Sequence, residues 1–314
     1  MRGLLVLAIG IAMGSAELCA FTPDDPDFLV QGEYVGEVAR PDGKKKLGMQ
    51  VIALGKGKFQ AVSYQGGLPG DGWDKGETRK SDGSAVNGVV TFKDGEYTTT
   101  IKDGATAVVT VSAANVGELK KITRQSPTLG AKPPEGAVVL FDGKNADQFE
   151  NGRMTDDGLL MQGATTKPKF QTGTLHLEFR LPFGPEEPSR GNSGCYLQGR
   201  YEVQMLNSFG LPPHNHECGG IPGVKEPDVN MCYPPFAWQT YDVDFTAADY
   251  KDGKKVKNAR ITVRHNGTVI HQDVEVPFAT QSSPLAEGPE PGPINLQDHG
   301  SQVRYRNLWF VEKK

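Results

Sequence analysis

Apolar and polar side chains alternate along most of this chain, and no long stretch repeats at the 3.6-residue period of a helix. In the first half such runs cover residues 47–53, 59–64, 89–92, 97–101 and 107–111. In the second half they cover residues 174–180, 194–198, 201–206, 239–245, 260–265, 268–276 and 302–311. Because side chains on a strand alternate between its two faces, the pattern predicts an all-β protein.

Turn signals separate many of these runs. Asp-Gly or Asn-Gly pairs recur at Asp42, Asp82, Asp94, Asp103, Asp142, Asp157, Asp252 and Asn266. Such pairs favour the tight turns of β-hairpins. The 39 glycines and 22 prolines among 314 residues support the same interpretation, while a hydrophobic content of 37% still supplies a packed core. A largely helical protein is therefore not expected.

Proline and glycine interrupt the alternating pattern at residues 126–134, just before the apolar run at residues 138–141. We predict a small antiparallel β-domain at residues 21–126, a linker at 127–134 and a larger β-domain at 135–314. Because the larger domain has many strand-like runs and no helical segments between them, it is expected to be a two-sheet sandwich.

The N-terminus has the features of a cleavable signal peptide, predicted here for residues 1–20. Arg2 is followed by an apolar run from Leu4 to Met13 and then by small residues, with cleavage expected after Ala16 or Ala20. The apolar run is too short to span a membrane. A periplasmic or secreted protein is therefore expected. The 34 basic and 38 acidic residues give a net charge of only −4, so no nucleic-acid partner is expected.

Cleavage after Ala20 leaves Cys195, Cys218 and Cys232 as the remaining cysteines. In an oxidising compartment Cys218 and Cys232 can close one short loop, and we predict this disulfide. Cys195 lies in a strand-like run, where it is expected to pack as a small hydrophobic residue.

Two segments combine residue types suited to acid–base chemistry. In the run 201–206, Glu202 and Gln204 share one face of the predicted strand, and apolar residues occupy the other. In the segment 296–300, His299 follows Asp298, and a carboxylate beside a histidine can fix its tautomer. Simpler interpretations also exist, namely a solvated outer face for the strand and a turn stabilised by Asp298.

Two further segments are less specific. His214, His216, Glu217 and Cys218 are all metal-ligand types, but their spacing matches no zinc motif, so a polar loop is the simpler interpretation. Residues 66–73 are rich in glycine but lack the Lys-Ser/Thr pair of a phosphate-binding loop.

A set of motifs in the second half occurs in a fixed order. The motifs are Val139-Leu140-Phe141-Asp142-Gly143-Lys144, Gly191-Asn192-Ser193-Gly194, Tyr201-Glu202-Val203-Gln204, Trp238-Gln239-Thr240-Tyr241-Asp242, Arg264-His265-Asn266-Gly267 and Leu296-Gln297-Asp298-His299-Gly300. Together they resemble the bacterial 3-keto-disaccharide hydrolase family over residues 135–314. The resemblance implies a concanavalin-like, laminin-G-type jelly-roll sandwich. It also implies exported enzymes that act on glycosides whose sugar carries a ketone at C3.

The resemblance also implies a mechanism and a set of site residues. The ketone acidifies the C2 proton, a base removes it, the C1 substituent leaves by β-elimination and water then adds. Glu202 and His299 are the expected acid–base residues. Substrate oxygens would be held by Arg200 and Gln204, with support from Asn192, Gln297 and Asp298. A divalent metal ion on Glu202 and His299 is an alternative to Arg200 as the electrophile.

One departure from the family concerns a loop. The family sequence Cys-Gly-x-Ile-Tyr-Gly reads Cys-Gly-Gly-Ile-Pro-Gly at residues 218–223, so Pro222 replaces a tyrosine that could contact sugar. The N-terminal part resembles a small β-domain that precedes this domain in some bacterial members, with no activity attached to it.

Two other functions are considered for the sandwich. A non-catalytic carbohydrate-binding module could use the same fold, because fold does not determine function. An ordinary retaining glucanase is ranked third, because it needs two carboxylates about 5 Å apart. The strand at residues 201–206 supplies only Glu202 and Gln204 at alternate positions.

Overall fold

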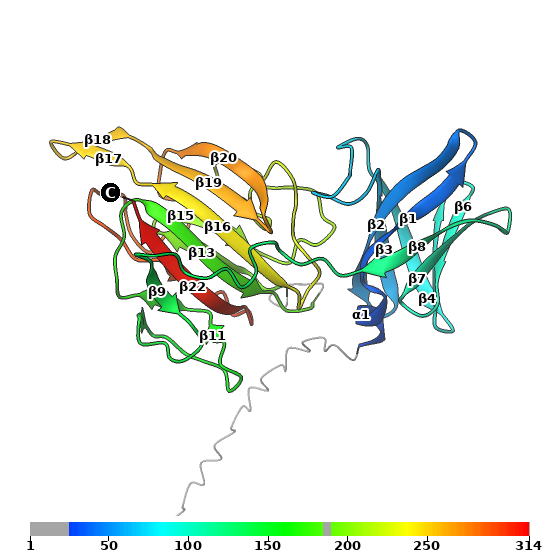
Figure 1. Ribbon diagram of the computed structural model, residues 1–314, viewed down its shortest axis with the longest axis horizontal. Coiled ribbons are helices and arrows are strands. Elements are labelled where there is room, and N and C mark those ends of the chain that lie inside the picture. Colours follow the sequence, from blue (N-terminus) through cyan, green and yellow to red (C-terminus); the bar gives the residue numbers. More distant parts are fainter. Residues whose placement is uncertain (1–24, 185–189, 314) are drawn as a thin grey trace, which may run out of the picture.

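The computed structural model describes residues 25–184 and 190–313, and the predicted signal peptide lies outside them. The described chain forms an N-terminal β-barrel and a C-terminal β-sandwich, joined by residues 123–137 (Figure 1). No helix in these described ranges is long and apolar enough to cross a membrane.

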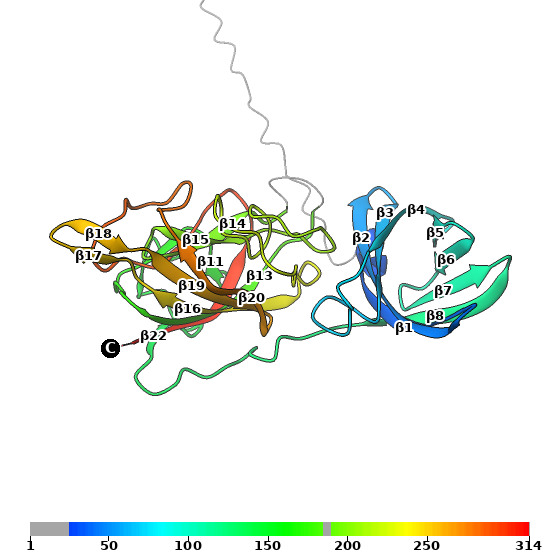
Figure 2. The same cartoon turned by 90° about the horizontal axis from the view of Figure 1, so that it is seen from above.

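In the described residues eight antiparallel strands close the barrel, each paired with the next along the chain and the last with the first. Figure 2 shows them around a central axis. The strands are β1 (Gly32–Arg40), β2 (Gly43–Gly55), β3 (Lys58–Gln65), β4 (Arg79–Val86), β5 (Val89–Asp94), β6 (Tyr97–Ile101), β7 (Thr106–Val111) and β8 (Ala114–Ile122). A short helix, α1 (Pro26–Val30), packs Phe28 and Val30 against the barrel core.

One predicted turn is wrong. Asp82 and Gly83 lie inside β4, not between two strands. The ring of Phe92, on the neighbouring strand β5, occupies the space where a side chain at position 83 would lie. The glycine is therefore needed for packing inside the barrel, which an Asp-Gly pair does not distinguish from a turn.

The sandwich contains, in the described residues, one sheet of five strands and one of seven. The five-stranded sheet has the order β10 (Phe149–Glu150), β12 (Ala164–Thr166), β21 (Asn295–Leu296), β14 (Ser193–Leu197) and β15 (Tyr201–Met205). The seven-stranded sheet has the order β11 (Leu160–Met161), β22 (Arg304–Glu312), β13 (Gly173–Arg180), β16 (Trp238–Thr246), β19 (Ala259–His265) and β20 (Thr268–Val276), with β9 (Val138–Phe141) paired to β22. A separate hairpin joins β17 (Asp249–Lys251) to β18 (Lys254–Lys257).

The sandwich core determines which side chains of β14 and β15 face outward. Cys195, Leu197, Val203 and Met205 belong to the fully buried apolar cluster that also contains the inward residues of β13. Because side chains alternate along a strand, the residues between them face the opposite side of the sheet. Tyr196, Glu202 and Gln204 are therefore on the outer face.

The connecting segment lies on the outer face of the seven-stranded sheet. The Thr128 hydroxyl donates to Asp242 at 2.6 Å, and the Gly130 N–H donates to Glu178 at 2.5 Å. The Ala131 carbonyl accepts from the Asn307 amide at 3.0 Å and from the Trp309 indole at 3.2 Å. These bonds fix the backbone of residues 128–131 to the sheet.

A buried histidine lies within this network. The His176 ring is completely buried, is stacked on Trp309 with 5.0 Å between centroids, and has Nδ1 2.6 Å from Asp242. Its Nε2 is 3.8 Å from Glu178. Burial alone would lower the pKa of His176, but the hydrogen bonds to Asp242 and Glu178 outweigh it, so the pKa is raised.

Candidate active site

A pocket of about 160 Å³ opens on the outer face of the five-stranded sheet. Its lining residues come from the turn before β14, from β14 and β15, from the segment after β21 and from two loops. They are Asn192, Tyr196, Glu202, Gln204, His216, Pro222, Gln281, Ser282, Gln297 and His299. The structure thus brings together Asn192, Glu202, Gln204, Gln297 and His299, which the sequence had assigned to one site.

The pairing of β14 with β15 positions the central carboxyl group. Tyr196 is directly opposite Glu202, and Gly194 is opposite Gln204. A Cβ atom at position 194 would overlap the Glu202 carboxyl group. The carboxyl group therefore lies over the backbone of β14 at a place that only a glycine leaves open.

Two loops cover the free edge of β15. The Gln204 N–H donates to the Gly220 carbonyl, and the Gly219 N–H donates to the Gln204 carbonyl, both at 2.9 Å. The Glu202 N–H donates to the Thr280 hydroxyl at 2.9 Å. These bonds hold the loops that carry the remaining lining residues, His216, Pro222, Gln281 and Ser282.

Glu202 has the electrostatic properties of a base that works near neutral pH. Only 4% of the residue is exposed, and burial raises the pKa of its carboxyl group to about 7. The hydrogen bond from Tyr196 opposes part of this rise, because it stabilises the ionised carboxylate. The Tyr196 hydroxyl oxygen is 2.9 Å from Glu202 Oε2.

Tyr196 has two acceptors for one proton. Its hydroxyl oxygen is also 2.9 Å from the Gln281 carbonyl and accepts from Gln297 Nε2 at 3.3 Å. Burial raises the pKa of Tyr196, so the hydroxyl keeps its proton. It can donate to Glu202 when that carboxylate is ionised, and to Gln281 when Glu202 is protonated and donates in turn.

The structure places two predicted site residues elsewhere. Arg200 belongs to the turn before β15, so the strand alternation does not extend to it. Its guanidinium donates to the carbonyls of Ala286 and Glu290, each at 2.8 Å, and does not line the pocket. Asp298 also lies outside the lining, where its carboxylate accepts from Arg153 at 3.2 Å. Both residues support loops rather than the pocket.

The predicted disulfide between Cys218 and Cys232 is absent from the structure. Cys218 and Cys232 are both buried and free in the structure, so the predicted disulfide is not formed in it. Both thiols lie in the sandwich core, where Cys218 Sγ is 3.3 Å from the Tyr241 hydroxyl oxygen. Cys195 is buried on the core face of β14.

The pocket does not fit the alternative metal centre. In the described ranges no group of three or more histidine, cysteine, aspartate or glutamate side chains is arranged to hold a metal ion. Glu202 and His299 both line the pocket, but the Glu202 carboxyl group is hydrogen-bonded to Tyr196. No step is therefore assigned to a metal ion.

Sequence reasoning missed Tyr196, although the signal was present. Tyr196 alternates with the core residues Cys195 and Leu197, which places it on the same face as Glu202. The loop residues His216, Gln281 and Ser282 had no comparable signal, because loops lack a periodic pattern.

Comparisons with known proteins concern mainly the sandwich. A family model described as a 3-keto-alpha-glucoside-1,2-lyase-like domain matches residues 136–311. The chain is similar to the crystal structure of a candidate glycosyl hydrolase from Parabacteroides distasonis ATCC 8503, with 33% identity and a TM-score of 0.52 over 57% of this chain and 85% of that chain. A second candidate glycosyl hydrolase from that organism shows 17% identity and a TM-score of 0.43 over 57% of this chain and 95% of that chain. No curated protein matches the sequence significantly.

Proposed function

Since the chain belongs to the 3-keto-alpha-glucoside-1,2-lyase-like domain family, we propose that it cleaves 3-keto-glycosides by abstraction of the C2 proton, β-elimination and hydration. The family and the glycosyl hydrolase neighbour support a carbohydrate-processing enzyme. The reaction itself is argued from the chemistry of the pocket. Export to the periplasm or the medium remains part of the proposal.

The observation that carries the proposal is the Glu202 carboxyl group, buried in the pocket with a pKa of about 7. A base is most effective when its pKa lies near the working pH. In the proposed reaction Glu202 takes the C2 proton, and the electron pair of that C–H bond forms an enolate with the C3 ketone. The C1–O bond then breaks, and addition of water across the new double bond completes net hydrolysis.

Uncharged hydrogen-bond donors in the pocket can stabilise the negative charge that develops on the enolate oxygen. The side-chain amides of Asn192, Gln204 and Gln297 line the pocket and can donate to the enolate oxygen or to sugar hydroxyls. When Glu202 becomes protonated, Tyr196 can accept from it and donate to the Gln281 carbonyl. In the proposed reaction His216 or His299, which are exposed and line the pocket, donates a proton to the leaving group.

An ordinary retaining glucanase is not supported by this pocket. Such enzymes need a second carboxyl group about 5 Å from the first. Among the described residues, Glu202 is the one carboxylate that lines the pocket. A carbohydrate-binding module without catalysis would need no base with a near-neutral pKa, and it is the alternative that the experiment must separate.

The test compares a 3-keto-glucoside with its parent glucoside in deuterated water. We expect cleavage of the keto substrate only, deuterium incorporation at C2, and kcat/KM that rises with pH through about 7 as Glu202 ionises. Activity should not require a divalent ion, so adding a chelator to the assay should leave the rate unchanged.

Glu202→Gln should abolish turnover and deuterium exchange while sugar binding persists. Asp298→Asn is the matched control, because this exposed carboxylate does not line the pocket. If wild-type protein binds sugars but turns over no 3-keto-glycoside, the binding module is correct. Equal cleavage of both glycosides without exchange at C2 would exclude the elimination mechanism.

A further inference from the structure

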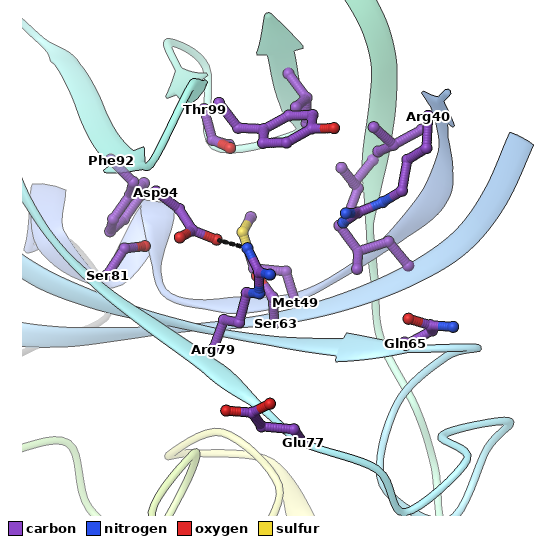
Figure 3. Close-up of a pocket in the computed structure, with 15 residues that line it drawn as sticks. Arg40, Met49, Ser63, Gln65, Glu77, Arg79, Ser81, Phe92, Asp94 and Thr99 are labelled. Atoms are coloured by element: carbon purple, nitrogen blue, oxygen red, sulfur yellow. Dashed lines mark hydrogen bonds and ion pairs between the residues drawn. The ribbon is translucent and has the colours of Figure 1, made fainter. Parts of the chain in front are cut away.

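The barrel interior changes from apolar to polar along its axis. On β3, Phe59 and Ala61 are buried in the barrel core, whereas the next residues on the same face, Ser63 and Gln65, line an open cavity. The interior of the barrel is thus not filled with apolar side chains to its end. Figure 3 shows this cavity.

The floor of the cavity is apolar. Val38, Met49, Phe92, Val109 and Leu119 line it, and each belongs to the buried barrel core. The cavity volume is about 110 Å³. Eight-stranded barrels are wide enough to hold one small ligand when side chains leave the interior partly open.

The mouth of the cavity is polar and charged. Arg79 and Asp94 pair at 3.5 Å, as the dashed line in Figure 3 shows. Hydroxyl groups of Ser63, Ser81 and Thr99 also line the cavity. None of these three hydroxyls has a hydrogen-bond partner within the described part of the protein, so all three can bind a ligand or water.

Arg40 is the cation at the cavity mouth that forms no ion pair in the described residues, although, after the hydrogen bond from Lys45, its charge helps to lower the pKa of Asp42. Its guanidinium lies over the Tyr97 ring, 5.2 Å from the centroid, although β8 and β7 separate β1 from β6 in the barrel order. The contact therefore spans the mouth. In the described ranges no carboxylate forms an ion pair with Arg40, and Figure 3 shows Glu77 well away from it.

We propose that the barrel binds a small amphiphilic monocarboxylate, independently of the reaction in the sandwich. The apolar end of this ligand contacts Met49 and Phe92, and its carboxylate binds the Arg40 guanidinium. A guanidinium forms short, charge-assisted hydrogen bonds to a carboxylate. Arg40 forms no ion pair among the described residues, and the acid that feels its charge, Asp42, is paired with Lys45. A sugar is a less suitable ligand, because it has no large apolar surface to pack against the floor of the cavity.

Calorimetric titration of the full protein with phenylacetate tests the proposal, and 2-phenylethanol serves as its uncharged counterpart. We expect phenylacetate to bind about tenfold more tightly than the alcohol, since one charge-assisted hydrogen bond is worth about 1.5 kcal/mol. Arg40→Gln should remove that difference, and Arg40→Lys should retain part of it. Lys102→Gln, an exposed cation at the opposite end of β6, should have no effect.

Ser63→Phe should block binding by filling the mouth, with circular dichroism to check that the barrel is folded. Absence of phenylacetate binding at millimolar concentration would overturn the proposal. Binding that Arg40→Gln leaves unchanged would also overturn it, as would glucose binding more tightly than phenylacetate. Proton abstraction in the sandwich is measured separately, so failure here would leave the proposed reaction intact.

Discussion

Gly194 and Glu202 form the most sensitive pair of residues in the candidate active site. The carboxyl group of Glu202 occupies the space where any other residue at position 194 would place its Cβ atom. The obstructed atoms are the end of a flexible side chain, so the backbone need not move. Position 194 should therefore control where the base lies and affect folding little.

Gly194→Ala should lower kcat on a 3-keto-glycoside by about 100-fold, the typical cost of displacing a catalytic group by about 1 Å. The melting temperature should change little, because alanine is tolerated in a strand. Gly288→Ala is the control, since a Cβ there meets only the Arg200 side chain at ordinary contact distance. Unchanged kcat in Gly194→Ala would show that the position of the Glu202 carboxyl group is not critical.

Strand alternation predicted which residues of β15 face the pocket, whereas the role of Arg200 was implied by the family resemblance and is not supported by its position. Glu202 and Gln204 follow the period of two, and the structure places both in the pocket. Arg200 lies in the turn before this strand, where alternation says nothing about the direction of a side chain. Its bonds to the carbonyls of Ala286 and Glu290 depend on a distant loop that no local pattern indicates.

The loop at residues 218–223 is the element in which this chain departs from its family. It is hydrogen-bonded to the edge of β15 and carries Pro222 into the pocket lining. The family resemblance leads to the expectation of a tyrosine at this position. Its replacement by proline removes a flat ring and a hydroxyl group from the sugar-facing surface, so substrate affinity is the property most directly affected.

Pro222→Tyr should lower KM for a 3-keto-glucoside about fivefold and leave kcat within about twofold, because an aromatic contact is worth about 1 kcal/mol. The substitution removes no backbone hydrogen bond, since proline has no N–H to donate. Steady-state kinetics measure both constants, with Pro212→Tyr, outside this pocket, as the control. A large fall in kcat without change in KM would contradict a binding role for position 222.

The strands of the sandwich were more predictable than the loops around the pocket. Hydrophobic alternation indicated β13, β15, β16 and β19 close to their observed bounds. In the barrel, β1, β4 and β8 lay outside the predicted runs. Strand β4 is mostly exposed and contains Asp82-Gly83, a sequence typical of turns. The Asp-Gly pair suggested a turn, but Gly83 is required because the Phe92 ring occupies the space next to it.

At the scale of the whole molecule, the segment joining barrel and sandwich is bound to the sheet rather than free. The interruption of the pattern at residues 126–134 marked the end of the barrel strands, but its proline and glycine content gave no sign of these bonds. Arg124, at the start of this segment, donates to Glu33 in the barrel and lies over the Tyr233 ring of the sandwich. The joining segment therefore contacts both the barrel and the sandwich.

His176 should make the stability of this attachment depend on pH. Its pKa is raised in the folded protein, so its stabilising contribution is complete below the unfolded pKa of about 6.5 and is lost as pH rises through the folded value. The free energy of unfolding, measured by denaturant titration between pH 6 and pH 9, should fall with pH. His176→Gln should reduce this fall.

Glu202 contributes in the same direction, because its pKa is also raised, so Glu202→Gln provides the background in which His176 is tested. His299→Gln serves as an exposed control. Parallel pH profiles for Glu202→Gln with and without His176→Gln would show that His176 does not titrate in this range.

Because this segment is bound to the sheet, the folded sandwich begins at an earlier residue than the domain that the family model matches. The family match begins at residue 136, yet the bonds that cover His176 and Glu178 come from residues 128–131. A fragment cut at the family boundary would expose two buried ionisable groups to water and lose the cap on Asn307 and Trp309. Any exchange of the barrel for another N-terminal partner must therefore retain these few residues with the sandwich.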